Sequence, residues 1–141
     1  MRRLDHANII KLHEVYEGKY NIYLVMENLN GGELFNELTK IGTFNEKHCS
    51  AILLQLLRAL DYIHTKGFVH RDVKLENLIF VNEGTLDIKI ADFGLSENLS
   101  KKKCLFKRCG TPGYVAPEIL DDQDYTFKCD IFSAGIVLFI L

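Results

Sequence analysis

The sequence predicts an α+β fold in which helices dominate and short β-ribbons are inserted. A long amphipathic stretch at residues 46–65 and an apolar stretch at the C-terminus predict helices. Two pairs of short β-prone segments, each interrupted by turn-prone residues, predict ribbons rather than a large sheet. At 141 residues, the chain is long enough for one ordinary domain.

The N-terminal part is expected to begin with a ribbon. Residues 9–15 and 22–26 have the composition of short strands, and the turn-prone segment 17–19 lies between them. The glycine pair at 31–32 then interrupts the chain before a short helix, which is expected from about Glu33 to Thr39.

The clearest helix is expected from about Glu46 to Thr65. Asn45 is a suitable N-cap, and Gly67 lies just beyond the predicted end. Apolar residues recur at the three- and four-residue spacing that places them on one buried helix face. They are Ile52, Leu53, Leu56, Leu57, Leu60 and Ile63.

The C-terminal part is expected to contain a second ribbon and a second buried helix. Residues 78–81 and 86–90 have the pattern of paired strands around the turn-prone segment 82–84. The polar, lysine-rich segment 96–108 has no periodicity and is expected to be a loop. A final helix is expected to begin near Asp130.

Composition and charge argue against several classes of function. The net charge of −2 gives no reason to expect attraction to nucleic acid or to a membrane surface. The four cysteines have no metal-binding spacing, and without a secretory signal they predict reduced thiols in the cytoplasm. Residues 131–141 are almost entirely apolar, but a bilayer span needs about 20 residues, so a buried core helix is expected there rather than an anchor.

The segment 70–77, His-Arg-Asp-Val-Lys-Leu-Glu-Asn, carries the strongest functional signal. It is followed by Asp-Phe-Gly at 92–94 and by Ala-Pro-Glu at 116–118. One such triplet would be weak, whereas the ordered set indicates a catalytic site. The residue types suit phosphoryl transfer, which requires metal ions, a group that orients the nucleophile, and positive charge near the phosphoryl group.

Four side chains meet these requirements. Asp72, in a loop, can present its carboxylate to a substrate hydroxyl, and Lys74 can meet a γ-phosphate. Asn77 and Asp92 supply a neutral and an anionic oxygen, which suit Mg²⁺.

Each residue taken singly also has an ordinary explanation. An aspartate or lysine in a loop can simply be solvated, Asn77 could be a helix cap, and Phe93 could belong to the core. His70 is interpreted as a structural histidine rather than a catalyst. Gly94 is expected to give the backbone the freedom to aim Asp92 while Phe93 packs inward. The combination in this order favours the catalytic site.

With these motifs, the sequence resembles the eukaryotic-type serine/threonine protein kinases over essentially its whole length, and is most similar to the calcium/calmodulin-dependent kinase group. The resemblance implies a partial protein-kinase-like fold: the end of the small lobe, the hinge, and the first part of the mainly helical large lobe. It implies ATP-dependent phosphorylation of serine and threonine hydroxyls on proteins. Asp72 and Lys74 would be catalytic, and Asn77 and Asp92 would bind Mg²⁺.

The resemblance also implies structural and regulatory roles. Arg71 matches an arginine that receives an activation-loop phosphate, and Glu118 matches a glutamate that pairs with a later arginine. Asp130 begins the helix that anchors the catalytic loop. The same structural group includes His70, Phe93 and Gly94.

An ATP site is implied around the hinge. Met26 matches the residue at the back of the adenine pocket, and the backbone from Glu27 to Leu29 would hold adenine. Glu33 would contact the ribose. Ile79, Asn77 and Asp92 complete the implied nucleotide-binding set.

Protein substrates with an arginine upstream of the target hydroxyl are implied by Glu33 and Glu76, which match acidic substrate-binding residues. A solvated surface charge remains the alternative for both glutamates. Residues 110–114 match the segment that positions the residue after the target hydroxyl, with Thr111 bonding toward Asp72.

The activation segment departs from the family pattern. Lys107 stands where relatives often carry a phosphorylatable or acidic residue, and Arg108 follows. Both would repel Arg71, so the usual phosphorylation switch is not expected. The lysines at 101–103 either form a solvated loop or meet an acidic partner.

Residues 1–141 are expected to form a partial kinase domain, from the end of the regulatory helix to the central helix of the large lobe. The glycine-rich loop, the strand lysine and its glutamate partner have no counterpart in the sequence. Two functions stay open: the intact parent protein is an active kinase, or the chain is a truncated, inactive remnant that acts as a protein-binding or regulatory module. Calmodulin or calcium regulation is expected only through regions outside these residues.

Overall fold

The computed structural model of the chain describes residues 1, 4–99, 108–121 and 126–141. Its elements are β1 (Leu12–Glu17), β2 (Ile22–Met26), α1 (Leu34–Ile41), α2 (Glu46–Thr65), β3 (Phe68–Val69), the 3-10 helix η1 (Leu75–Asn77), β4 (Leu78–Phe80), β5 (Ile88–Ile90), β6 (Glu97–Asn98), α3 (Pro117–Leu120) and α4 (Lys128–Ile140). The strands form three two-stranded antiparallel ribbons, β1–β2, β3–β6 and β4–β5. The predicted α+β class is confirmed.

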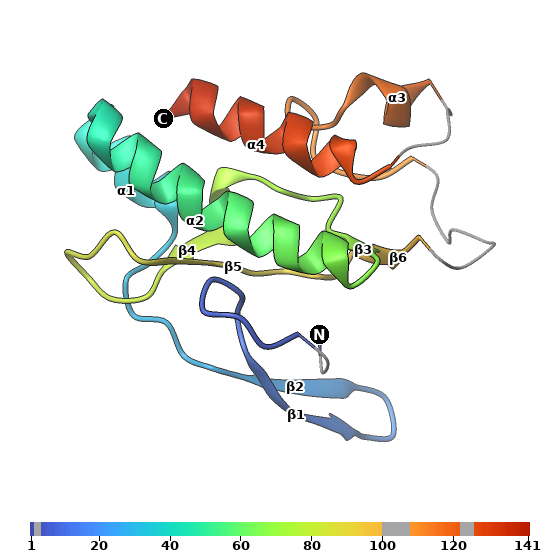
Figure 1. The fold of residues 1–141 in the computed structure, drawn as a ribbon. Helices are drawn as coiled ribbons and strands as arrows, with labels where there is room; N and C mark the ends of the chain where they lie inside the picture. The colour runs from blue at the N-terminus through green and yellow to red at the C-terminus, as the bar shows by residue number, and fades with distance from the viewer. Residues whose placement is uncertain (2–3, 100–107, 122–125) are drawn as a thin grey trace.

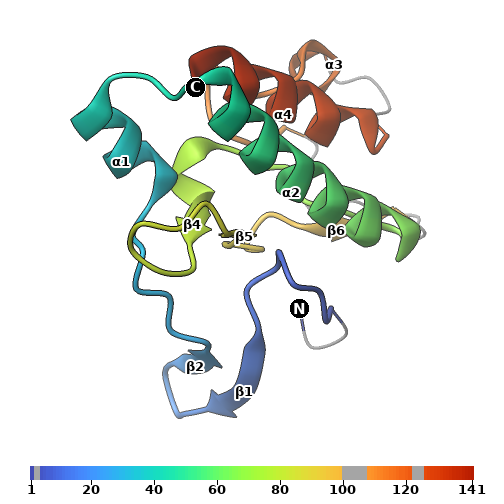
Figure 2. The ribbon, with the colours of Figure 1, turned by 60° about the vertical axis from the view of Figure 1, so that its left-hand side comes forward.

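The ribbon β1–β2 lies at one end of the molecule, apart from the helices, whereas α2 lies between α4 and the ribbon β4–β5 (Figures 1 and 2). Strand β1 begins later than predicted because the residues before it bind elsewhere. The Ile10 N–H donates to the Ile90 carbonyl, and the Ile90 N–H donates to the Asn8 carbonyl. These bonds tie the N-terminal segment to β5.

Helix α2 has the predicted bounds. The Asn45 side chain accepts a hydrogen bond from the His48 N–H at 2.9 Å, which caps the first turn. Gly67 follows the helix with a φ of 80°, a conformation that favours glycine. Most of the predicted apolar face is buried, although Leu57 is exposed and Ala59 takes a buried position instead.

The glycine pair before α1 is explained by two different constraints. A Cβ on Gly31 would lie 2.5 Å from the Phe80 Cβ, so only glycine allows this close approach to β4. Gly32 meets no neighbour but has a φ of 74°, which other residues rarely adopt. The segment is fixed there, since the Gly31 N–H donates to the Phe80 carbonyl and the Phe80 N–H donates to the Gly32 carbonyl.

Three short elements were not predicted: the ribbon β3–β6, η1 and α3. The segment 96–108 was expected to be a loop, but Glu97 and Asn98 pair with Val69 and Phe68. Its residues 100–107, with the lysines at 101–103 and Lys107, lie outside the described residues. A two-residue strand has no detectable period, so no pattern could have revealed it.

Helix α4 packs beside α2 and is buried on one side only. Cys129, Ala134 and Val137 are enclosed, whereas Phe139 is 89% exposed. The helix expected here is thus present and contributes buried residues to the core on one of its faces. None of the helices in the described part of the chain combines the length and the apolar character needed to cross a bilayer.

Candidate active site

Asp72 is the centre of a compact polar cluster in the loop between β3 and η1. Its carboxylate lies 2.9 Å from the Lys74 Nζ and accepts a hydrogen bond of 2.6 Å from the Thr111 hydroxyl. Lys74 Nζ also donates to the Thr111 Oγ1 at 2.9 Å. The Asn77 Nδ2 donates to the Asp72 backbone carbonyl at 2.8 Å and to its Oδ2 at 3.1 Å. Residues of the predicted segments 70–77 and 110–114 therefore meet.

The cluster favours charged forms of both catalytic candidates. Burial alone would raise the pKa of Asp72, but hydrogen bonds from Thr111, Lys74 and Asn77 outweigh it and hold the pKa below its ordinary value. Burial would lower the pKa of Lys74, but the carboxylate of Asp72 raises it. At neutral pH the loop thus presents an ionised carboxylate beside an ammonium group.

Asp130, at the start of α4, holds the backbone on the N-terminal side of Asp72. Its fully buried carboxylate accepts hydrogen bonds from the backbone N–H groups of His70 and Arg71, each at 2.8 Å. The ring of His64 lies 2.7 Å from the same carboxylate. Arg71 has a φ of 71°, and these bonds stabilise that strained turn. The contribution of His64 was missed, because a histidine at a helix end carries no signal of its own.

His70 lies inside the core and is fully buried. Its Nε2 donates to the Ala91 carbonyl at 3.1 Å, while its Nδ1 accepts from the Asp72 N–H at 3.3 Å. These partners require the neutral ring. Burial lowers the pKa of His70, against the opposing charges of nearby carboxylates. The Phe93 ring packs edge-on against it, with the ring centroids 4.8 Å apart.

Arg71 has a partner that the sequence did not reveal. The guanidinium is almost fully buried, its Nε donates to the Leu95 carbonyl at 2.6 Å, and its NH2 group lies 3.8 Å from the Glu97 carboxylate. Glu97 belongs to β6, which was expected to be loop. The site therefore contains a carboxylate beside the arginine that the resemblance assigns to an activation-loop phosphate.

The turn after β5 presents Asp92 differently from the prediction. Asp92 itself has the positive φ, 54°, whereas Gly94 does not. The Gly94 N–H donates to the Asp92 Oδ1 at 3.0 Å, and a Cβ on Gly94 would lie 3.0 Å from that oxygen. Glycine therefore provides space for this hydrogen bond rather than an unusual φ.

Asn77 and Asp92 have a donor set that fits Mg²⁺. The side-chain amide nitrogen of Asn77 faces Asp72, so the other atom of that amide, Oδ1, remains for a cation. The backbones of the two candidates are adjacent, since the Ala91 N–H donates to the Asn77 carbonyl at 2.8 Å. Amide and carboxylate oxygens suit this metal, which usually completes its shell with water and phosphate. Among the described residues, no group of three or more His, Cys, Asp or Glu side chains gathers as an alternative metal site.

Four of the residues expected to contact the nucleotide lie between the end of β2 and the start of α1, and a fifth, Ile79, lies in β4. Glu33, just before α1, forms an isolated antiparallel bridge with Ile79. Met26, the last residue of β2, is 42% exposed. The Glu27 N–H donates to the Lys11 carbonyl at 3.0 Å, so it is already occupied. Leu29, in the following segment, is partly buried.

The two other predicted glutamates differ in their surroundings. Glu76, in η1, is partly buried, and its Oε2 is enclosed without a hydrogen-bond partner among the described residues. Its charge contributes, after burial, to raising the pKa of Tyr114. Glu118, in the first turn of α3, forms no ion pair within the described part of the chain.

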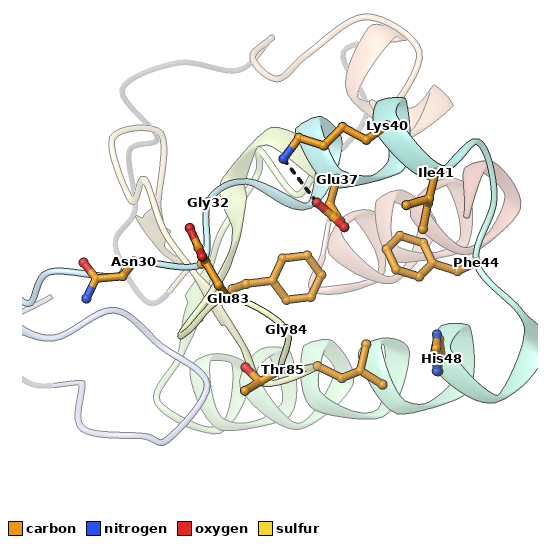
Figure 3. A pocket seen from close by; sticks show the side chains of 13 residues that line it. Asn30, Gly32, Glu37, Lys40, Ile41, Phe44, His48, Glu83, Gly84 and Thr85 are labelled. Atoms are coloured by element: carbon orange, nitrogen blue, oxygen red, sulfur yellow. Dashed lines mark hydrogen bonds and ion pairs between the residues drawn. The ribbon is translucent and has the colours of Figure 1, made fainter.

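Two cavities lie outside the Asp72 cluster. One, of about 590 Å³, opens between α1, the start of α2 and the turn after β4; Figure 3 shows the Glu37–Lys40 ion pair on one side of it and residues 83–85 on another. It contains none of the predicted catalytic residues. The second, of about 350 Å³, is lined by Arg108, Cys109, Gly110, Pro112, Gly113, Val115 and Leu120, so it adjoins Thr111.

Comparison with known proteins identifies the family of the chain. The sequence model of the family described as "Protein kinase domain" matches residues 1–141. The chain is 43% identical to a calcium/calmodulin-dependent protein kinase type 1 of Macrobrachium nipponense, over 100% of this chain and 41% of the relative. It is 42% identical to a probable myosin light chain kinase of Dictyostelium discoideum, over 97% of this chain and 44% of the relative. It is 44% identical to calcium-dependent protein kinase 5 of Plasmodium berghei, over 100% of this chain and 25% of the relative.

The chain thus spans less than half the length of these curated relatives. The match nevertheless covers every described element, and the expected kinase-like fold is confirmed. The chain belongs to the protein kinase domain family, and the relatives that it resembles include kinases of the calcium/calmodulin-dependent and calcium-dependent types.

Proposed function

We propose that the protein containing these residues transfers the γ-phosphoryl group of ATP, with Mg²⁺, to serine or threonine hydroxyls of protein substrates. The observation that carries this proposal is the Asp72 cluster, in which an ionised carboxylate, an ammonium group and a hydroxyl lie within hydrogen-bond distance of one another. Phosphoryl transfer requires positioning and charge more than covalent chemistry, and this cluster supplies both.

In the proposed reaction, Asp72 accepts a hydrogen bond from the substrate hydroxyl and orients its oxygen toward the γ-phosphorus. As the new oxygen–phosphorus bond forms and the bond to the ADP oxygen breaks, the hydroxyl proton passes to Asp72. Lys74 places positive charge beside the transferred group. Mg²⁺, when bound, neutralises charge on the phosphates; Asn77 and Asp92 would hold it.

Substrate selection is proposed to rest on charge and on one apolar pocket. A basic substrate side chain would supply the hydrogen bond that the enclosed Glu76 oxygen lacks. Glu33 is proposed to bind a basic substrate side chain as well. The 350 Å³ cavity beside Thr111, with Pro112, Val115 and Leu120, suits a small apolar residue after the target hydroxyl. Arginine upstream of the target is therefore expected to increase kcat/KM.

A cytoplasmic location and calcium control are also proposed. Reduced cysteines fit a cytoplasmic protein. The names of the relatives include calcium/calmodulin-dependent and calcium-dependent kinases, which supports calcium control through segments other than these 141 residues.

The test uses the complete protein with labelled Mg-ATP and matched peptides. Three peptides differ only in the target residue, serine, threonine or tyrosine, and a fourth replaces the upstream arginine with alanine. We expect label on serine and threonine only, about tenfold lower kcat/KM without the arginine, and no transfer in EDTA. Transfer to tyrosine alone, or none to any peptide, would contradict the proposal; no transfer combined with capture of a protein partner would favour the inactive-module alternative.

A further inference from the structure

The hinge residue Glu27 and Lys89 of β5 form an ion pair between distant parts of the chain. The Glu27 Oε1 accepts a hydrogen bond from the Lys89 Nζ at 2.8 Å and another from the Lys11 backbone N–H at 2.6 Å. The Glu27 N–H in turn donates to the Lys11 carbonyl. One carboxylate therefore joins the hinge, the residue before β1, and β5.

This pair differs from ordinary surface ion pairs. Only 22% of the Glu27 side chain and 16% of the Lys89 side chain are exposed. Burial would raise the pKa of Glu27, but the hydrogen bonds from Lys89 and Lys11 lower it, so the carboxylate is charged at neutral pH. Among the described residues, it is the only ion pair that joins residues 1–30 to the rest of the chain.

Lys89 stands at an informative position in the ribbon β4–β5. It lies directly opposite Ile79, so the two side chains share one face, whereas Ile88 and Ile90 are buried on the other face. The same strand leads two residues beyond Ile90 to Asp92. Lys89 is thus placed between the hinge and the segment that presents the metal-binding candidate.

We propose that Lys89 is a positioning residue for ATP, acting through Glu27. The pair fixes the hinge backbone, which the proposed function assigns to adenine, relative to the strand that presents Asp92, which it assigns to the metal. Backbone hydrogen bonds of Ile10 and Gly31 tie the neighbouring segments to β5 and β4, and the pair adds the side-chain contact that fixes the hinge residue Glu27 itself against β5. This inference rests on the proposed function, because it concerns how the same site holds ATP.

The test measures steady-state kinetics of the complete protein and three variants: Lys89→Met, Glu27→Gln and both together. We expect Lys89→Met to raise the KM for Mg-ATP about fivefold, the lower end of ordinary coupling between sites, with the peptide KM unchanged. The double variant should lose no more than either single variant, because both remove one interaction. Lys89→Arg should keep the KM of the unmodified protein.

Lys40→Met is the matched control, since Lys40 pairs with Glu37 at 3.3 Å on α1 with both side chains well exposed. It should leave both KM values unchanged. If Lys89→Met keeps the ATP KM of an active unmodified protein, or raises the ATP and peptide KM values equally, the positioning role is contradicted. If the unmodified protein fails to transfer phosphate at all, the proposed function is contradicted, and this inference with it.

Discussion

Thr111 links the two charged residues of the site. Its hydroxyl donates to the Asp72 carboxylate and accepts from the Lys74 ammonium group, so it orients both. It lies about forty residues from them in sequence, on the segment that also borders the 350 Å³ cavity. One hydroxyl therefore joins the proposed catalytic pair to the segment that is proposed to position the substrate.

Replacing Thr111 with valine should lower kcat about 10- to 100-fold, because a hydrogen bond to a charged group contributes about 1.5–3 kcal/mol. The loss of this bond should also raise the pKa of Asp72, so the acidic limb of the pH–rate profile should move to higher pH. Steady-state kinetics over a range of pH would check both effects. Thr111→Ser keeps the hydroxyl and should retain most activity; full activity in Thr111→Val would contradict the role.

Two glycines show how packing constrains the elements of the fold. Gly31 is required by the close approach of its segment to β4, whereas Gly135, in α4, has no neighbour within 4 Å of a built Cβ. Identical substitutions should therefore have opposite effects at the two positions.

Gly31→Ala should reduce the free energy of unfolding by about 1–3 kcal/mol, the usual cost of overpacking. Gly135→Ala should be neutral or stabilise by up to about 1 kcal/mol, because alanine restricts the unfolded chain and favours the helix. Urea unfolding followed by circular dichroism would compare them. Equal effects of the two substitutions would show that the contact between Gly31 and Phe80 does not constrain the fold.

The long elements were predictable because their patterns repeat. Helix α2 spans many turns, so its apolar spacing and the Asn45 cap fixed both bounds. The ribbons β1–β2 and β4–β5 were found through their turn residues. Strand β2 has the predicted bounds, whereas β1, β4 and β5 differ from prediction by one to three residues at one or both ends. The two-residue strand β6 escaped, and with it Glu97, because its pairing with β3 is decided by tertiary contacts.

The candidate site was predictable to a different degree. Motif order identified Asp72, Lys74, Asn77 and Asp92, and the resemblance related Thr111 to Asp72. The sequence could not reveal which side chains bind to a given carboxylate. Examples are His64, which binds to Asp130, and Lys89, which binds to Glu27. Those contacts depend on how helices and ribbons pack, which residue spacing does not specify.

For the whole molecule, buried His70 connects stability to pH. Its pKa is lowered from the ordinary value of 6.5 because burial disfavours the charged ring, although Asp130, Asp72 and Asp92 oppose this. Below pH 6.5, His70 binds a proton in the unfolded chain but stays neutral in the folded chain until the pH reaches its lowered pKa. The free energy of unfolding should therefore decrease as the pH falls from about 7 to about 5.

Urea unfolding of His70→Gln at the two pH values would check this expectation. Glutamine can replace both hydrogen bonds but does not titrate, so the variant should lose part of the pH dependence. His13→Gln, at an exposed position of β1, is the control and should keep the full dependence. An unchanged pH dependence in His70→Gln would contradict the assignment of a neutral buried ring.

The most direct test of the central claim is phosphate transfer by the complete protein carrying Asp72→Asn. Asparagine keeps the size of the side chain, but its amide nitrogen cannot accept the hydrogen bonds that Lys74 and Asn77 donate to the carboxylate, and it cannot take the proton. We therefore expect kcat to fall by about 10²–10⁴-fold while the chain still folds and binds Mg-ATP. Asp61→Asn, on the exposed side of α2, should retain normal activity. Normal transfer by Asp72→Asn would contradict the assignment of the catalytic site.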